Sequence, residues 1–175
     1  DGTTLTSNGL NGAVSVIALA PRGTMFNPKG AFYMNKIVTG AEAASVIDIT
    51  APAGENVRRV AKAKGVDVSE ITVIVLDRPR HEKMIAELRE IGCGIMLIPD
   101  GDVAGVIATT NPETNVDMYM GSGGAPEGAV HRVASHGGAR TERRPGAGAS
   151  VRGGSRGGTP GRWRDARLRA CARRQ

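Results

Sequence analysis

The clearest pattern of apolar positions lies in the middle of the chain. Residues 71–76 (ITVIVL) and 95–98 (IMLI) are continuous apolar runs, typical of strands that are buried on both faces. Between them, apolar side chains recur at helical spacing over residues 82–91, and Gly92 and Gly94 follow as glycines do at helix ends. The pattern predicts a β-α-β unit whose strands are parallel and whose crossover is right-handed.

Shorter apolar patterns on both sides of this unit predict further elements. Strands are expected at residues 13–20, 24–26, 32–38 and 116–120, the first two as an antiparallel pair. Helices are expected from Pro52 to Gly65 and over residues 103–109, where helix-ending residues flank an apolar pattern. Antiparallel strands early in the chain and parallel strands later favour a layered α/β sandwich over a purely doubly wound sheet.

Charged residues follow both central strands, at the edge where open parallel sheets bind their ligands. Arg78 and Arg80 flank a proline at the start of the helix, which suits an anion such as phosphate. Asp100 and Asp102 flank Gly101 after the second strand, which suits sugar hydroxyls or a metal ion. Each group alone is equally compatible with a solvated loop or a helix cap. Two such groups at neighbouring strand ends favour a binding site.

Two other segments carry groups suited to metal and phosphate chemistry. The glycine-rich residues 121–128 follow the third predicted strand and place Glu127 in the first turn of a helix. They predict a ligand-binding loop, with a flexible connection as the alternative. At the start of the chain, Asp1 offers a carboxylate for a metal beside the Thr3 hydroxyl, which can position a water. Asp-Gly-Thr alone is also a common turn.

The net charge of +6 and the isoelectric point near 9.9 average two unlike parts of the chain. Residues 131–175 hold 12 Arg, no Lys and 2 acidic residues, a net charge of +10. Residues 1–130 keep the other 11 basic and 15 acidic residues, a net charge of −4. We therefore expect a folded domain over residues 1–130 and a disordered Arg/Gly-rich tail over residues 131–175, which lacks the apolar periodicity of a core.

Cysteine usage and chain hydropathy favour the cytoplasm. Cys93 and Cys171 have no metal-ligand spacing, which indicates a reducing compartment. No apolar run approaches the length of a membrane span, and no signal-peptide pattern appears. The first residue is Asp rather than Met, so the chain is expected to be a fragment or a processed product.

Five short segments resemble, in order and in approximate spacing, motifs of the class II (GlpX-type) fructose-1,6-bisphosphatases. They are Asp1–Thr3 (DGT), Tyr33–Lys36 (YMNK), Arg78–His81 (RPRH), Pro99–Ala104 (PDGDVA) and Gly123–Gly128 (GGAPEG). The resemblance covers about residues 1–130. It implies the layered α/β sandwich of the inositol-monophosphatase-like sugar phosphatases, here incomplete at the N-terminus.

The resemblance also implies an activity and a cofactor. Family members use Mn²⁺ or Mg²⁺ to remove the 1-phosphate of fructose 1,6-bisphosphate in gluconeogenesis, and some accept sedoheptulose 1,7-bisphosphate. A phosphosugar substrate, no membrane partner and a homo-oligomeric full-length protein are therefore expected.

Residue roles carry over by motif. Asp1 and Glu127 resemble metal ligands, and Asp1 and Thr3 are the expected catalytic residues, with the Thr3 hydroxyl orienting the attacking water. The expected substrate contacts are Gly2, Thr3, Tyr33, Arg78, Pro79, Arg80, Asp100, Gly101, Asp102 and Gly124. Arginines would hold the phosphate that is not cleaved, and aspartates would select a polyol through its hydroxyls.

The chain departs from the family pattern at both ends. The family has further metal carboxylates upstream of Asp1, so the chain alone is expected to be inactive. After Val130 the Arg-rich sequence resembles the product of GC-rich DNA translated out of frame. If that tail is genuine, the alternative function is nucleic-acid binding through residues 151–158 (VRGGSRGG). A non-catalytic phosphosugar-binding domain is a third reading.

Overall fold

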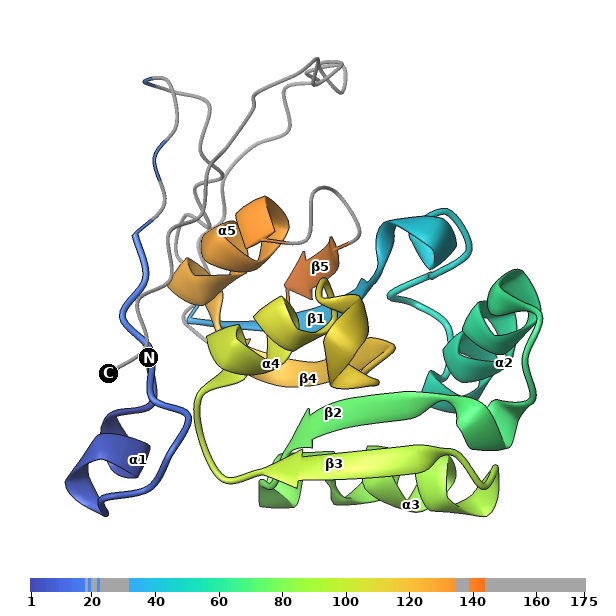
Figure 1. Cartoon of the computed structure of the whole chain (residues 1–175), viewed down its shortest axis with the longest axis horizontal. Helices are drawn as coiled ribbons and strands as arrows, with labels where there is room; N and C mark the ends of the chain where they lie inside the picture. The colour runs from blue at the N-terminus through green and yellow to red at the C-terminus, as the bar shows by residue number, and fades with distance from the viewer. Residues whose placement is uncertain (18, 20–21, 23–31, 135–138, 144–175) are drawn as a thin grey trace, which may run out of the picture.

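The computed structural model describes residues 1–17, 19, 22, 32–134 and 139–143. Within these residues the strands form one five-stranded sheet in the order β3-β2-β4-β1-β5 (Figure 1). The strands are β1 (Tyr33–Thr39), β2 (Thr72–Leu76), β3 (Gly94–Ile98), β4 (Met118–Gly124) and β5 (Ala139–Arg143). The α-helices are α1 (Thr3–Ser7), α2 (Ala53–Lys64), α3 (Glu82–Glu90), α4 (Asp102–Ala108) and α5 (Ala125–Ala134). Single 3-10 turns are η1 (Ala41–Ala43), η2 (Val68–Glu70), η3 (Pro79–His81) and η4 (Pro112–Thr114).

Strand pairing confirms the predicted β-α-β unit and the mixed sheet. Strand β2 pairs in parallel with β3 on one side and with β4 on the other. Strand β1 pairs antiparallel with both β4 and β5. A mixed sheet with helices packed against it establishes the α/β class.

The core has two parts because successive side chains of a strand point to opposite faces of the sheet. Val73 and Val75 join the larger cluster, to which α2 and α3 contribute their apolar stripes. Ile74 lies in the second cluster, with Val106 of α4 and Tyr119 of β4. The continuous apolar run of β2 therefore reflects burial on both faces, as predicted.

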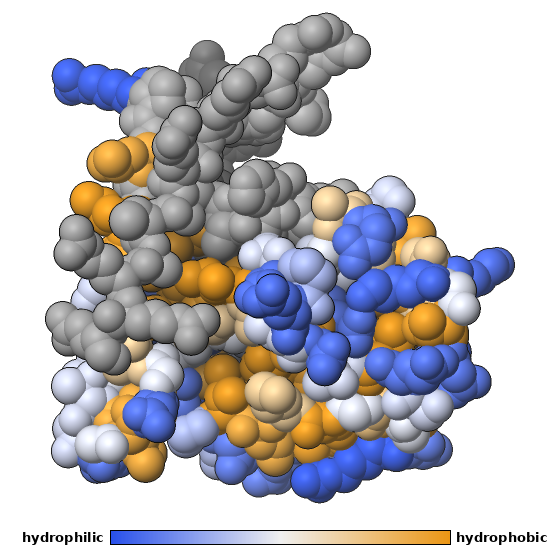
Figure 2. Space-filling model, in the orientation of Figure 1, coloured by the Kyte–Doolittle hydropathy of each residue, from blue (hydrophilic) through white to orange (hydrophobic). Residues whose placement is uncertain are grey.

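Apolar side chains are also exposed on the surface. On the face shown in Figure 2, apolar residues lie in patches among charged ones. Met96 and Leu97 of the edge strand β3 are 44% and 38% exposed. No helix in the described part of the chain is long and apolar enough to cross a membrane.

The prediction of a strand over residues 13–20 is wrong for residues 13–17, which contain only an isolated bridge at Ser15. The reason is a local pairing with the first residue. The main-chain nitrogen of Asp1 donates to the Val14 carbonyl at 2.8 Å, and the Val14 amide donates back to the Asp1 carbonyl at 3.0 Å. The predicted partner strand at residues 24–26 lies outside the described residues.

The prediction of a glycine-rich loop over residues 121–128 is also wrong. Residues 121–124 form the second half of β4, where they pair with Tyr33–Lys36 of β1, and α5 follows directly. These glycines continue a strand because their backbone groups meet a partner strand. The expected loss of regular structure after residue 130 is wrong for the last turn of α5 and for β5.

Candidate metal centre

Three carboxylates from distant parts of the chain meet at one end of the sheet. Asp1 precedes α1, Asp102 is the first residue of α4, and Glu127 lies in the first turn of α5. One carboxylate oxygen from each lies within 4.8 Å of the other two. Asp1 and Glu127 are thus brought together as expected for metal ligands. Asp102, which the sequence indicated as a substrate contact, lies in the same cluster.

Lys36 of β1 stands between two of these carboxylates. Its Nζ lies 2.7 Å from Asp102 Oδ2 and 3.3 Å from Glu127 Oε2, and its side chain is wholly buried. A buried ammonium needs such partners, because an unpaired charge away from water is costly. Lys36 therefore balances part of the negative charge of the cluster.

Tyr119 of β4 completes the buried side of the cluster. Its hydroxyl donates to Asp102 Oδ2 at 3.3 Å. Burial, followed by the neighbouring charge of Asp102, raises the pKa of Tyr119 well above 10.0. The phenol therefore stays protonated and acts as a hydrogen-bond donor.

The surroundings of Glu127 oppose its ionisation. Burial and then the charge of Asp102 raise its pKa above the ordinary value, and Lys36 opposes both effects. Like charges held close together favour a cation at the same place.

Gly123 leaves the space in which Asp102 and Lys36 meet. A Cβ atom at this position would lie 2.8 Å from Asp102 Oδ2 and 3.2 Å from Lys36 Nζ. Both distances are shorter than a carbon atom normally keeps. Any residue with a side chain at 123 would therefore push against this ion pair.

Hydrogen bonds from main-chain amides to carboxylates connect the first residues of the chain to the start of α4 and the loop before it. The Val103 amide donates to Asp1 Oδ2 at 2.9 Å, and the Thr4 amide donates to Asp100 Oδ2 at 3.0 Å. These bonds fix the Asp1 carboxylate beside Asp102. Gly2 is buried, whereas Thr3 is exposed at the first position of α1.

The expected substrate-binding residues on the other loop form a second group. Arg80 Nε donates to the Ser122 carbonyl at 2.8 Å, and its guanidinium lies 5.6 Å from the centre of the Tyr33 ring. Tyr33 faces Gly124 in the register of β1 and β4. A terminal nitrogen of Arg78 lies 3.6 Å from Asp100 Oδ1. Pro79, which lies between the two arginines, is the first residue of turn η3. Gly101 directly precedes α4.

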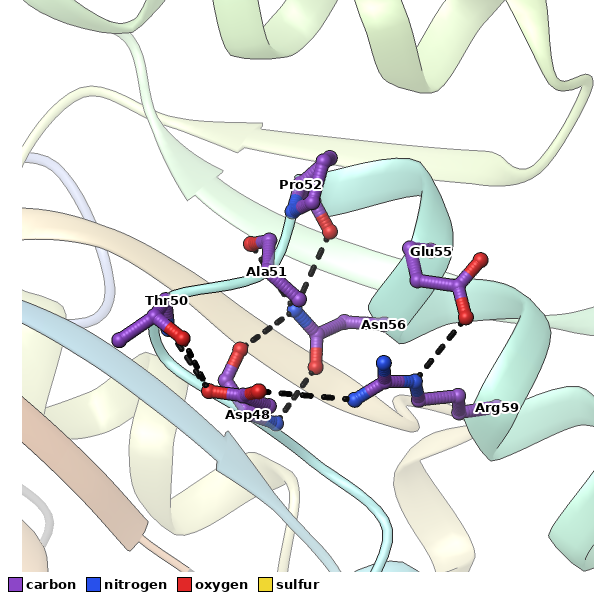
Figure 3. Close-up of polar contacts among 7 residues, drawn as sticks. All are labelled: Asp48, Thr50, Ala51, Pro52, Glu55, Asn56 and Arg59. Carbon is purple, nitrogen blue, oxygen red and sulfur yellow. Dashed lines mark hydrogen bonds and ion pairs between the residues drawn. The ribbon is translucent and has the colours of Figure 1, made fainter.

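A third polar group is structural. Asn56 of α2 accepts from the Asp48 amide at 2.8 Å and donates to the carbonyls of Asp48, Ala51 and Pro52 at 2.9, 3.3 and 3.1 Å (Figure 3). Asp48 in turn accepts from the amide and hydroxyl of Thr50. These bonds fix the loop that enters α2.

Oxygen ligands of this kind suit a hard divalent cation. The cluster offers carboxylates alone, as Mg²⁺ and Mn²⁺ sites commonly do. Asp102 is buried, but Asp1 is exposed and the Glu127 side chain is 41% exposed, which leaves the cluster open to water and ligand. The donor set therefore fits such an ion.

Sequence reasoning gave no role to Lys36, His81 or Tyr119, although Lys36 and His81 lie within two of the family-like motifs. The signal for Lys36 was a single charge inside the apolar strand pattern of residues 32–38. It shares a sheet face with Met34 and Val38, so the period-two rule indicates a buried lysine that requires a carboxylate partner.

Comparison with known proteins identifies the family. A family model described as bacterial fructose-1,6-bisphosphatase, glpX-encoded, matches residues 1–139. The chain is 42% identical over 130 residues to fructose-1,6-bisphosphatase 1 class 2 of Escherichia coli K12. The same identity is found with the class 2 enzymes of Escherichia coli O6:H1 and Shigella flexneri. Each alignment covers 74% of this chain and 38% of the relative, so the chain spans well under half of their length. The chain belongs to the glpX-encoded, class 2 fructose-1,6-bisphosphatase family.

Proposed function

We propose that this chain carries part of the active site of a metal-dependent phosphatase that removes the 1-phosphate of fructose 1,6-bisphosphate. The observation that carries the proposal is the convergence of Asp1, Asp102 and Glu127 around the buried ammonium of Lys36. The family supports the same activity. We extend the proposal to sedoheptulose 1,7-bisphosphate, to a role in gluconeogenesis and to the layered sugar-phosphatase sandwich in the complete protein.

Two groups of residues act on the two phosphates of the substrate. Asp1, Asp102 and Glu127 would hold Mn²⁺ or Mg²⁺, which supplies charge neutralisation for the phosphate that is cleaved. Arg78 and Arg80 bind the other phosphate through charge-assisted hydrogen bonds, each worth about 1.5–3 kcal/mol. The sugar lies between these groups.

Thr3 and Asp100 complete the proposed site. The exposed Thr3 hydroxyl accepts a hydrogen bond from the attacking water or donates one to it, and so orients the water toward phosphorus. Asp100 is partly exposed and accepts hydrogen bonds from sugar hydroxyls with its remaining lone pairs. Hydrolysis then depends on positioning and charge rather than on a covalent intermediate.

The complete activity is proposed to need the remainder of a full-length enzyme. The aligned region corresponds to 38% of the relatives' length. We therefore expect the purified 175-residue chain to bind substrate but to release phosphate very slowly. Robust metal-dependent turnover by the chain alone would contradict this part of the proposal.

A chimera tests the active-site assignment. Residues 1–130 would replace the matching segment of the Escherichia coli K12 relative, and phosphate release would be followed with Mn²⁺ and with Mg²⁺. The proposal expects metal-dependent turnover that falls at least about a hundredfold in Glu127→Gln, since a metal ligand is lost. Glu113→Gln is the matched control, because Glu113 lies in turn η4, outside the carboxylate cluster. Equal turnover in both variants would remove Glu127 from the site.

The same chimera separates phosphate binding from chemistry. Arg80→Ala is expected to raise KM with little change in kcat, because Arg80 would bind the phosphate that does not react. Substrate binding by the chain that requires no divalent metal would instead favour a non-catalytic phosphosugar-binding domain.

A further inference from the structure

His81 lies at the junction between the arginine turn and the sheet. The side chain belongs to turn η3, and the residue is only 3% exposed. Its Nδ1 lies 2.7 Å from the Leu76 carbonyl oxygen, and its Nε2 lies 2.8 Å from the Ser122 amide nitrogen. A carbonyl only accepts and an amide only donates, so the ring carries its proton on Nδ1 and accepts with Nε2.

These bonds continue the sheet past the point at which β2 ends. Strands β2 and β4 pair from Val73–Met118 to Val75–Met120, and β2 stops at Leu76. Strand β4 runs on through Ser122, where β2 offers no further partner. The His81 ring connects the Leu76 carbonyl, the last of β2, to the Ser122 amide of β4. It therefore takes the place of a direct backbone hydrogen bond between the two strands.

Arg80 uses the other backbone group of the same residue. Its Nε donates to the Ser122 carbonyl at 2.8 Å, while the Ser122 amide donates to His81. Two consecutive side chains of one turn thus hold both polar backbone atoms of one strand residue. The guanidinium is placed above the Tyr33 ring at 5.6 Å and is fixed by its Nε rather than by its terminal nitrogens.

Gly121 makes the close approach of the imidazole possible. A Cβ atom at this position would lie 3.2 Å from His81 Cε1. Ser122 itself is 6% exposed, so the contact between turn and strand is shielded from water. Hydrogen bonds in such a place are stronger than on the surface, and losing one leaves a buried group unsatisfied.

We propose that His81 is a positioning residue that holds the Arg78–Arg80 turn against β4 and so orients Arg80 toward the phosphate of the substrate that is not cleaved. The inference rests on the proposed function, because it assigns Arg80 to a phosphosugar. It adds a residue that need not touch substrate. The essential contact is Nε2 with the Ser122 amide, because this bond ties the turn to the strand that also carries the Arg80 contact.

Two amide substitutions divide the two bonds of the imidazole. His81→Asn places an amide near the position of Nδ1 and retains the donor to the Leu76 carbonyl. His81→Gln places its oxygen near the position of Nε2 and retains the acceptor for the Ser122 amide. We expect His81→Asn to weaken binding of fructose 1,6-bisphosphate to the 175-residue chain about tenfold, and His81→Gln to weaken it much less. Isothermal titration in the presence of Mn²⁺ measures both.

Thr39→Val controls for loss of stability. Thr39 is wholly buried, and its hydroxyl donates to the Asp117 carbonyl at 2.9 Å, at the end of β1 away from Tyr33. This variant also loses a buried hydrogen bond, so its melting temperature should fall. Its affinity for fructose 1,6-bisphosphate should stay unchanged, whereas a general effect of destabilisation would lower it.

Hydrogen exchange tests, without any ligand, whether His81 holds the Arg78–Arg80 turn against β4. Exchange of the Ser122 amide and of Arg80 Nε–H should accelerate in His81→Asn and stay slow in His81→Gln. Equal affinities in wild type and His81→Asn, or unchanged exchange at both groups, would overturn the inference. If wild type does not bind fructose 1,6-bisphosphate, the proposed function fails for this chain. Slow exchange that depends on His81 would then show that His81 only stabilises the contact between the turn and β4. This result would also overturn its role in positioning Arg80 for substrate.

Discussion

The Lys36 ammonium and the Asp102 carboxylate form an ion pair of 2.7 Å whose side chains are 0% and 4% exposed. Lys36 comes from β1 and Asp102 from the start of α4, so the pair joins the sheet to the helix that covers it. Removal of either partner leaves the other charge buried.

Lys36→Met should destabilise the metal-free chain by about 3 kcal/mol, because Asp102 and Glu127 lose their shared counter-charge. The double variant Lys36→Met/Asp102→Asn should recover much of that loss, since it no longer buries an unpaired carboxylate. Denaturant unfolding of both proteins measures the difference. A single variant as stable as wild type would show that the pair is not buried in solution.

Divalent cations should stabilise the chain through the carboxylate cluster. At about a hundred times the Kd, a ligand that binds only the folded state adds about 2.7 kcal/mol. We expect Mn²⁺ to raise the melting temperature of wild type, and Glu127→Gln to abolish most of the increase. Glu113→Gln should respond as wild type does. An increase that survives Glu127→Gln unchanged would place the cation elsewhere.

Asn56 should contribute strongly to stability although it is remote from the carboxylates. Asn56→Ala leaves the Asp48 amide and the entry to α2 without their partner, with an expected cost of about 2–3 kcal/mol. Asn111→Ala provides a matched comparison. Asn111 caps only turn η4 through the Glu113 amide, so its loss should cost about 1 kcal/mol. Equal losses in the two variants would contradict the network in Figure 3.

Asp48 should contribute to the acid limb of the stability profile. Hydrogen bonds from the Thr50 hydroxyl and amide lower the pKa of Asp48 below 3.8. A depressed folded-state pKa stabilises the fold above the unfolded value, and this contribution is lost as pH falls through the folded pKa. A titration of the Asp48 carboxyl carbon by NMR should show the lowered pKa.

Substitutions at two hydroxyls check the cause of that shift. Thr50→Ala should raise the pKa of Asp48 and leave that of Asp67 unchanged. Hydrogen bonds from the Ser69 amide and hydroxyl separately lower the pKa of Asp67. Ser69→Ala should therefore raise the pKa of Asp67 and leave that of Asp48 unchanged. A shift of both carboxyls in either variant would point to a global change instead.

Cys93 should be a slow nucleophile in the folded chain. The residue is 9% exposed, and burial raises the pKa of its thiol above 9.0. Thiolate is the reactive form, so alkylation by maleimide should be much slower than for a free thiol and should accelerate on unfolding. A Cys171→Ser background isolates this reaction. Equal rates in native and denaturing buffer would show that Cys93 is accessible.

The sequence predicted the elements whose pattern is independent of their partners. The β2-α3-β3 unit was found because both strands are continuous apolar runs and the helix between them has an apolar stripe. Burial on both faces holds for β2 but is wrong for β3, because β3 lies at the edge of the sheet and leaves Met96 and Leu97 exposed. Residues 13–17 gave the same apolar signal, but hydrogen bonds to Asp1 hold them outside the sheet. None of residues 13–17 is buried, so an apolar run alone establishes neither burial nor strand pairing.

The candidate site was predicted in part for a similar reason. Motifs located Asp1 and Glu127, and the structure brings both into one cluster. The residues around Asp102 indicated sugar hydroxyls or a metal ion, and the family resemblance implied a substrate contact. Only the fold shows that the Asp102 carboxylate lies beside Lys36. Contacts between residues 66 positions apart depend on the order and register of strands, which local patterns do not encode.

The absence of a side chain at Gly123 limits the substitutions that the carboxylate cluster can tolerate. A saturation library would ordinarily identify a functional position by the side chain that cannot be removed. Here the addition of one methyl group should displace the Lys36–Asp102 pair, because the pair occupies the space that the methyl group would need. Directed evolution of this chain would therefore find few acceptable codons at a position that has no side chain to exchange.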